Sequence, residues 1–168
     1  MSHELVAIGF DPGLAVTGYG VVRAVGGKWE ALAGGVIKTN KDTPRADRLR
    51  VIHEEARSLI ESYSPAGIAI EEIFFATNAQ TAMRTAEARG VLLMAATGFP
   101  VRGYTPLQVK KRVTGYGKAN KAQVQAMVKR LLSLAETPKP DDMADGLALA
   151  LCYLLEENGV NPREHDYV

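Results

Sequence analysis

Apolar runs in the first 40 positions predict three β-strands. The runs lie at 5–10, 18–25 and 30–39, and short links that contain glycine separate them. Apolar runs of this length, bounded by turn-forming residues, are typical of buried strands. Because the links are short, the three strands are expected to pair as an antiparallel meander.

The middle of the chain alternates between helical and strand patterns. Thr43 and Pro44 predict a helix start, with threonine as the N-cap and proline at the first helical position. Apolar residues then recur at helical spacing to about Tyr63, where Ser64 and Pro65 end the helix. A fourth apolar strand follows at 66–72. Asn78 is expected to cap a second helix with an apolar side formed by Ala79, Met83, Ala86 and Leu93.

The last third predicts one strand and three helices. The strand lies at 99–105, and a short helix at 107–113 is followed by a glycine-containing loop at 114–120. A longer helix is expected from Lys121 to Ala135, and the last runs from Asp142 to about Glu156. The predicted inward residues of the longer helix are Val124, Met127, Val128, Leu131 and Leu132.

These elements predict an α/β domain with a mixed five-stranded sheet flanked by helices. Residues 1–157 are expected to form a single domain, and 158–168 a loose polar tail. The pattern does not fix the order of the strands. Whether the first and fourth strands are neighbours therefore stays open at this point.

The overall charge changes this picture, because it is unevenly distributed. The net charge is +1, but residues 101–140 carry nine basic side chains and one acid, Glu136. That segment is therefore +8 and the other 128 residues sum to −7. A basic segment beside an acidic remainder is typical of a protein that binds a polyanion and holds its own carboxylate site. A solvated helix face is the alternative interpretation.

Carboxylates stand at the ends of two apolar strands and at the start of the last helix. Asp11 ends the first strand, Glu71 and Glu72 end the fourth, and Asp142 and Asp145 share one helix face. If these elements converge, the repelling charges need cations, and oxygen ligands suit Mg²⁺ or Mn²⁺. Two ions about 3.5–4 Å apart would clamp a scissile phosphodiester. Taken singly, the same acids fit a turn, a solvated strand end or a helix N-terminus.

Other chemistry finds little support. The three histidines are isolated, no nucleophile elbow or phosphate loop is present, and the lone Cys152 lies in an apolar run. A single cysteine, no visible signal peptide and no apolar stretch near the roughly 20 residues that span a bilayer predict a cytoplasmic protein.

Four collinear motifs resemble the RuvC family of bacterial Holliday junction resolvases. They are GFDPGLAVTGYGVV, IAIEEIFFATNAQTAMRTAEARGVLL, YTPLQVKKRVTGYGKANKAQVQAMV and DDMADGLALAL. The resemblance implies a ribonuclease H-like fold and a cytoplasmic homodimer that makes paired, symmetric nicks in four-way DNA junctions during recombination and repair. It also implies Mg²⁺, with two ions per active site and Mn²⁺ as a substitute, and cooperation with the branch-migration motor of the RuvA and RuvB proteins.

The resemblance also assigns residues. It implies that the catalytic, metal-binding acids are Asp11, Glu71, Asp142 and Asp145, and it favours Asp142 over Asp141, whose contribution stays open. Some relatives have histidine at position 142. Phe74 is implied to stack on bases at the opened crossover, and Lys110 and Lys121 to approach the substrate. Together with the basic segment, this predicts a DNA-binding set of Phe74, Lys110, Lys111, Arg112, Lys118 and Lys121.

Three rival interpretations remain. A different ribonuclease H-like nuclease would share the acids but cut RNA. An actin-like or sugar-kinase ATPase also begins with Asp-x-Gly, but it needs a second phosphate loop and a longer chain. A catalytically silent junction-binding module is the third, and the intact acid set argues against it.

Overall fold

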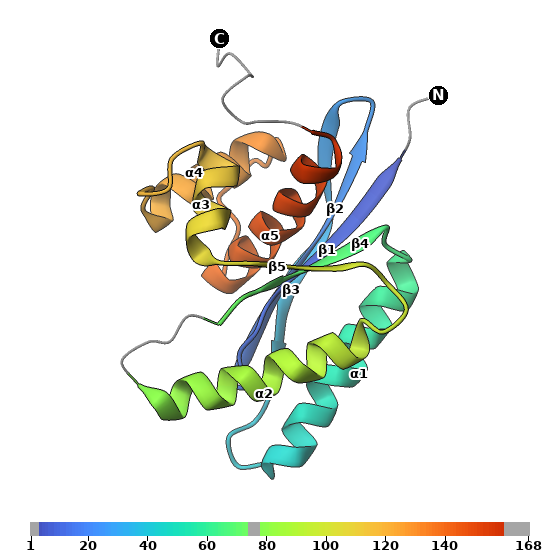
Figure 1. The fold of residues 1–168 in the computed structure, drawn as a ribbon, viewed down its shortest axis with the longest axis vertical. Coiled ribbons are helices and arrows are strands. Elements are labelled where there is room, and N and C mark those ends of the chain that lie inside the picture. The colour runs from blue at the N-terminus through green and yellow to red at the C-terminus, as the bar shows by residue number, and fades with distance from the viewer. Residues whose placement is uncertain (1–3, 74–77, 160–168) are drawn as a thin grey trace.

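The fold is built on one five-stranded mixed sheet, as the sequence predicts (Figure 1). The structure is a computed structural model that describes residues 4–73 and 78–159. The strands lie in the order β3-β2-β1-β4-β5, with β1 antiparallel to β2, β2 antiparallel to β3, and β4 parallel to both β1 and β5. Their bounds are β1 (Leu5–Asp11), β2 (Val16–Val25), β3 (Lys28–Lys38), β4 (Gly67–Glu71) and β5 (Val101–Tyr104).

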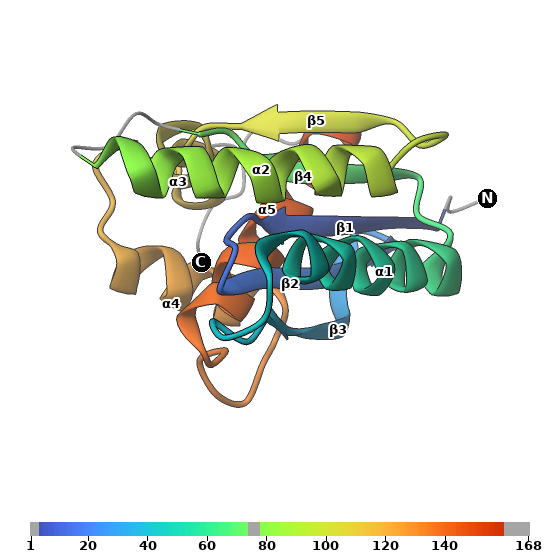
Figure 2. The same cartoon turned by 90° about the horizontal axis from the view of Figure 1, so that it is seen from below.

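Helices cover both faces of the sheet. Their bounds are α1 (Arg45–Tyr63), α2 (Ala79–Ala95), α3 (Pro106–Thr114), α4 (Lys121–Leu131) and α5 (Asp141–Glu157). Helices α1 and α2 lie side by side on one face, and α5 covers the other, with α3 and α4 against it (Figures 1 and 2). Each face has its own apolar cluster, because successive strand residues such as Ala7 and Ile8 point to opposite sides.

Glycines allow α5 to lie unusually close to β1 and β2. A Cβ atom on Gly18 would fall 1.9 Å from the carbonyl oxygen of Asp142, and one on Gly20 would fall 2.4 Å from the Leu147 nitrogen. On the helix itself, a Cβ atom on Gly146 would fall 2.4 Å from the Tyr19 carbonyl carbon. Any larger residue at these positions would push the helix away from the strands.

The helix boundaries agree with the sequence at most points and differ at two. Asn78 caps α2 as predicted, accepting hydrogen bonds from the amides of residues 80 and 81 at 3.0 and 3.3 Å. The sequence predicts Thr43 as the cap of α1, but Pro44 occupies that position with extended ψ. The prediction for α4 is too long, because Leu132 ends the helix and Ser133 has a φ of 51°. The predicted inward residues of α4 are buried or partly buried.

The apolar side predicted for α2 does not face the core. The buried residues of this helix are Ala88, Leu92 and Ala95, whereas Met83 and Leu93 are 66% and 38% exposed. Both sides of α2 are apolar, so helical spacing alone identifies the wrong one. The exposed side is therefore an apolar surface that residues 4–73 and 78–159 leave uncovered.

Within the described residues, no helix combines the length and apolar character that crossing a membrane requires. The predicted loose tail falls, from residue 160 onward, outside the described residues. The division into one domain and a tail stays a prediction.

Candidate metal-dependent active site

The sheet order places Asp11 beside Glu71. Strands β1 and β4 are parallel neighbours, with Phe10 opposite Ile70, so both strands deliver their last residue to the same edge of the sheet. The Asp11 and Glu71 carboxyl groups share a hydrogen bond. Two carboxyl groups make this bond only when one of them keeps a proton. The two predicted acids are therefore close enough to compete for a single positive charge.

The turn after Asp11 is held by the buried side chain of Thr17. Its hydroxyl donates to the Gly13 carbonyl at 2.8 Å and lies 3.4 Å from the Gly13 amide nitrogen. A Cβ atom on Gly13 would fall 2.2 Å from the Val16 carbonyl oxygen, so the turn requires glycine there. These contacts fold the chain back tightly directly after Asp11.

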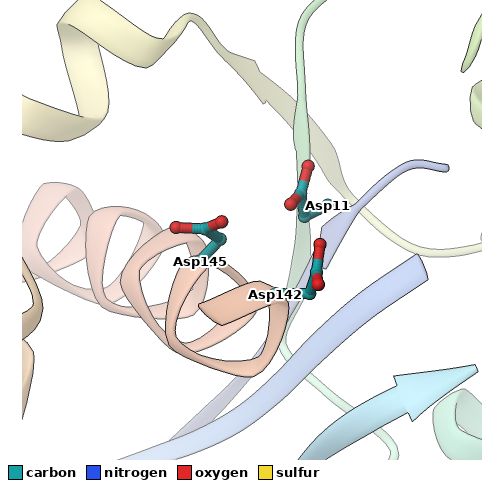
Figure 3. Close-up of side chains that lie close together, drawn as sticks. All are labelled: Asp11, Asp142 and Asp145. Carbon is teal, nitrogen blue, oxygen red and sulfur yellow. The ribbon is translucent and has the colours of Figure 1, made fainter. Parts of the chain in front are cut away.

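Helix α5 brings the third and fourth acids to the same place. Asp142 and Asp145 lie in its first turns, and their carboxylate oxygens come within 4.8 Å of one another and of an Asp11 oxygen. The three side chains lie close together where the start of α5 meets the end of β1 (Figure 3). Glu71 adjoins this cluster through Asp11. The structure thus brings Asp11, Asp142 and Asp145 together and places Glu71 next to Asp11.

Burial and repulsion between the acids raise the pKa values of Asp11, Glu71 and Asp145. Burial raises the pKa of Asp11 to about 9, and the charges of Glu71, Asp145 and Asp142 add to the shift. Burial also raises the pKa of Glu71, against the hydrogen bond from Asp11, which lowers it. Asp145 has a raised pKa mainly because of burial, with Lys121 acting in the opposite direction. A cation bound among these carboxylates would therefore offset the cost of burying their charges.

Lys121 is the cation nearest to the cluster among the described residues. Its ammonium nitrogen lies 3.6 Å from an Asp145 oxygen and 3.3 Å from an Asp141 oxygen. Partial burial lowers the pKa of Lys121, but the two aspartates outweigh that effect and the pKa is raised. Asp141 points away from the cluster to Lys121 and to the Gln125 amide, which donates to it at 3.0 Å. Asp141 thus orients Lys121 and stands outside the 4.8 Å group.

The donor set fits a hard divalent cation. Three carboxylates with oxygens within 4.8 Å of one another supply only oxygen ligands, and Glu71 adds a fourth from β4. Oxygen-only sites of this kind suit Mg²⁺ or Mn²⁺ better than ions that prefer nitrogen or sulfur. The raised pKa values of Asp11 and Asp145 point the same way, because a bound cation would remove the repulsion that causes part of each shift.

Comparison with known proteins assigns the chain to a family. The family described as "Crossover junction endodeoxyribonuclease RuvC" matches residues 7–153. The chain belongs to the RuvC family. It is 47% identical over 151 residues to the RuvC protein of Desulforamulus reducens, covering 89% of this chain and 93% of that one. It is 48% identical over 151 residues to that of Natranaerobius thermophilus, covering 89% and 94%.

A solved RuvC structure has the same fold. It is "T. thermophilus RuvC in complex with Holliday junction substrate", with a TM-score of 0.88 at 37% identity over 92% of this chain and 96% of that one. The likeness confirms the predicted ribonuclease H-like α/β fold. It also confirms the family that the four sequence motifs indicated.

The residues predicted to bind DNA lie on different elements and have different neighbours. Lys110 and Lys111 lie on α3, Lys118 follows in the loop before α4, and Lys121 stands at the acid cluster. Arg112 instead points to α5, with its guanidinium 3.5 Å from Glu156 and above the Tyr104 ring. Arg112 therefore has a clear structural partner. Phe74 lies outside the described residues.

Sequence reasoning missed Arg89, which holds the strand end that carries Glu71. Its Nε donates to the Glu71 carbonyl oxygen at 3.1 Å, and its Nη2 donates to Glu72 at 2.8 Å. One arginine on an amphipathic helix gives no signal of this kind. The close approach of α5 does have a signal in the sequence, since glycines alternate along β2 at positions 18 and 20.

Proposed function

We propose that this protein is a divalent-metal-dependent endonuclease that resolves four-way DNA junctions by symmetric paired nicks. The single observation that carries the proposal is the meeting of Asp11, Asp142 and Asp145 within 4.8 Å, from elements distant in the sequence, in a RuvC-family chain. The crossover junction endodeoxyribonuclease activity named for the family supports the reaction. The Holliday junction substrate of the T. thermophilus protein supports the DNA structure on which it acts.

Asp11, Glu71, Asp142 and Asp145 are the residues that would hold Mg²⁺, with two ions per site and Mn²⁺ as a substitute. When bound, such ions lower the pKa of water and neutralise charge on a phosphodiester. The chain itself supplies the geometry of the binding site. Asp141 holds Lys121 beside Asp145, where its ammonium can meet a phosphate.

The basic surface of α3, the α3–α4 loop and the start of α4 is the proposed DNA path. Lys110, Lys111 and Lys118 form no ion pair with any residue that the structure describes, so their charges are available for phosphates. Arg112 contributes by fixing α3 through Glu156. Phe74, which follows β4 in the sequence, is proposed to stack on an unpaired base at the crossover, where stacking is worth about 1–3 kcal/mol.

A homodimer is proposed because a junction with two-fold symmetry needs two active sites. The uncovered apolar side of α2 supports α2 as the contact, since Met83 and Met94 are 66% and 67% exposed there. Met94→Lys should shift the protein from dimer to monomer in sedimentation velocity. Leu107→Lys, at a 62% exposed apolar residue on α3, is the matched control and should remain dimeric. If the two variants had the same oligomeric state, the exposed side of α2 would not be the dimer interface.

Two further parts of the proposal rest on family membership. We propose that the protein acts in the cytoplasm during recombination and DNA repair, with the RuvA and RuvB proteins as the branch-migration motor. Co-purification of the three proteins on a synthetic junction tests this association, and absence of any ternary complex would count against it.

One experiment tests the function against its rivals. Purified protein is offered a synthetic four-way junction, a linear duplex of the same sequence and an RNA hairpin, each with Mg²⁺ or with a chelator. Paired nicks in the junction alone, only with Mg²⁺, are expected. Preferential cutting of the hairpin would indicate an RNA nuclease, and junction binding without nicks would indicate a silent binding module. Asp11→Asn controls for a contaminating nuclease.

A further inference from the structure

The carboxyl end of β4 is held from α2 as well as by its pairing with β5. Arg89 reaches across with two donors, one to the Glu71 carbonyl oxygen at 3.1 Å and one to the Glu72 carboxylate at 2.8 Å. The Arg89 side chain is only 19% exposed, so water competes little for these bonds. The main chain of Glu71 is therefore fixed by a charged hydrogen bond at the point where its side chain enters the acid cluster.

The sheet cannot supply this bond. The amide nitrogens of Ile68 and Glu72 donate to carbonyl oxygens at Pro100 and Tyr104, on the β5 side, so the main-chain groups of the alternate residue Glu71 face β1. With Phe10 opposite Ile70, the donor that would follow along β1 for the Glu71 carbonyl is the nitrogen of Pro12. Proline has no N–H. Arg89 takes the place of the missing ladder donor.

A glycine on β5 makes room for the second half of the contact. A Cβ atom on Gly103 would fall 1.8 Å from the Glu72 carboxylate oxygen, the same oxygen that accepts from Arg89. Glu72 also donates its amide to the Tyr104 carbonyl at 2.8 Å. The side chain of Glu72 thus lies across β5 in a space that only glycine leaves open, and from there it orients the guanidinium of Arg89.

We propose that Arg89 is a positioning residue that aims Glu71 at the metal cluster, with Glu72 and Gly103 holding Arg89 in place. Arg89 acts through the main chain of Glu71, and its bonds go to that carbonyl oxygen and to the Glu72 carboxylate. The inference rests on the proposed role of Glu71 as a metal ligand. It gives Arg89 a function that simple attachment of α2 to the sheet would not have, namely control of cation affinity.

Arg57 is a matched control at the far end of the same helical layer. Its guanidinium also donates to main-chain carbonyls, those of Ala95 at 3.1 Å and Thr97 at 3.4 Å, and to a glutamate, Glu61, at 2.8 Å. Arg57→Ala therefore removes the same kinds of bond between α1 and the end of α2. It leaves the end of β4 untouched.

The test measures Mn²⁺ binding to the free protein by calorimetry, without DNA. Arg89→Ala should weaken binding about tenfold or more, the range typical for residues that orient metal ligands. Arg57→Ala should leave affinity within about twofold of wild type, because it touches no part of the site. Glu72→Ala, at a half-exposed side chain, should also weaken Mn²⁺ binding, but less than Arg89→Ala does. It provides the test if Arg89→Ala does not fold. Arg89→Lys, which keeps one charged donor, should fall between Arg89→Ala and wild type.

Cleavage then separates this inference from the proposed site. Glu71→Gln should be inactive on a synthetic junction, whereas Arg89→Ala should regain much of its rate when Mg²⁺ is raised. If Glu71→Gln cuts normally, the proposed role of Glu71 fails and the inference fails with it. If Glu71→Gln is inactive while both Arg89→Ala and Glu72→Ala bind Mn²⁺ like Arg57→Ala, only the role of Arg89 is overturned.

Discussion

Replacing Asp11 with asparagine should make the metal-free protein more stable while it abolishes cleavage. Asp11 is a buried acid with carboxylate oxygens of two other aspartates within 4.8 Å, and Glu71 adjoins it. An asparagine has nearly the same shape, removes one of the repelling charges and can donate a hydrogen bond to Glu71. The change therefore reduces the electrostatic repulsion within the cluster without altering the packing around it.

The magnitude follows from the spacing of the charges. Two unit charges 4.8 Å apart repel by about 3.5 kcal/mol at an effective dielectric constant of about 20, and by about 0.9 kcal/mol in bulk water. Lys121 offsets part of this repulsion. We expect a net gain of about 2–3 kcal/mol in the free energy of unfolding. For a chain of this size, that corresponds to a rise in Tm of about 4–10 °C.

The gain should depend on pH in a defined direction. Because burial and neighbouring charges raise the pKa of Asp11 to about 9 from 3.8, the folded wild type favours the protonated acid. The stability that this protonation contributes is fully present below the unfolded pKa and is lost as pH rises toward 9. The difference between the variant and the wild type should therefore be small near pH 4 and widen up to about pH 9.

Thermal unfolding in chelator at about pH 5 and about pH 8, both within the window between the two pKa values, measures both effects. Added Mg²⁺ should raise the Tm of the wild type much more than that of Asp11→Asn. The difference in Tm between the two proteins should therefore shrink or change sign. Asp47→Asn, at an exposed acid in the first turn of α1, is the control and should lose up to about 1 kcal/mol at either pH. An Asp11→Asn protein that melts below the wild type in chelator at the higher pH would refute the reasoning.

Three further outcomes are expected. Asp145→Asn should bind junctions and not cut them, while Asp142→His should be milder because imidazole can also bind a metal; comparable nicking rates in both would contradict this. Replacing Lys110 and Lys121 together should flatten the dependence of log affinity on log salt by about 0.9 for each phosphate that the protein no longer neutralises, and an unchanged slope would place the DNA on another surface. Phe74→Ala should bind junctions almost normally, cut them poorly and be rescued by tyrosine, whereas a large loss of Tm would mean that Phe74 is buried.

Local patterns predicted the elements of this fold well because each is encoded within a few residues. The apolar runs marked all five strands, and Asn78 marked the start of α2 through its side-chain cap. Patterns were less informative where a choice depends on distant neighbours. The apolar side of α2 that carries Met83 resembles a core face, yet the sheet lies against the side that carries Leu92.

The candidate site shows the same division between local and distant information. Asp11 and Glu71 stand out in the sequence because carboxylates at the ends of apolar strands are unusual, whereas the family resemblance is needed to choose Asp142 over Asp141. Their meeting could not be derived, since it needs β1 beside β4 and α5 close to β2. Arg89 stayed hidden for a related reason, because its partner is a main-chain carbonyl, and every residue has one.

The site is therefore held together by packing that opposes its own electrostatics. Glycines at positions 18 and 20 let α5 approach so closely that Asp142 and Asp145 meet Asp11. The apolar side chains of α5 are deeply buried, so their packing can hold charges together that would separate in a looser fold. Because the repulsion between these carboxylates remains after folding, a cation that binds at the end of β1 would relieve it. A larger residue at position 18 would push α5 away from β2 and separate the carboxylates. The site would then bind a metal ion less tightly.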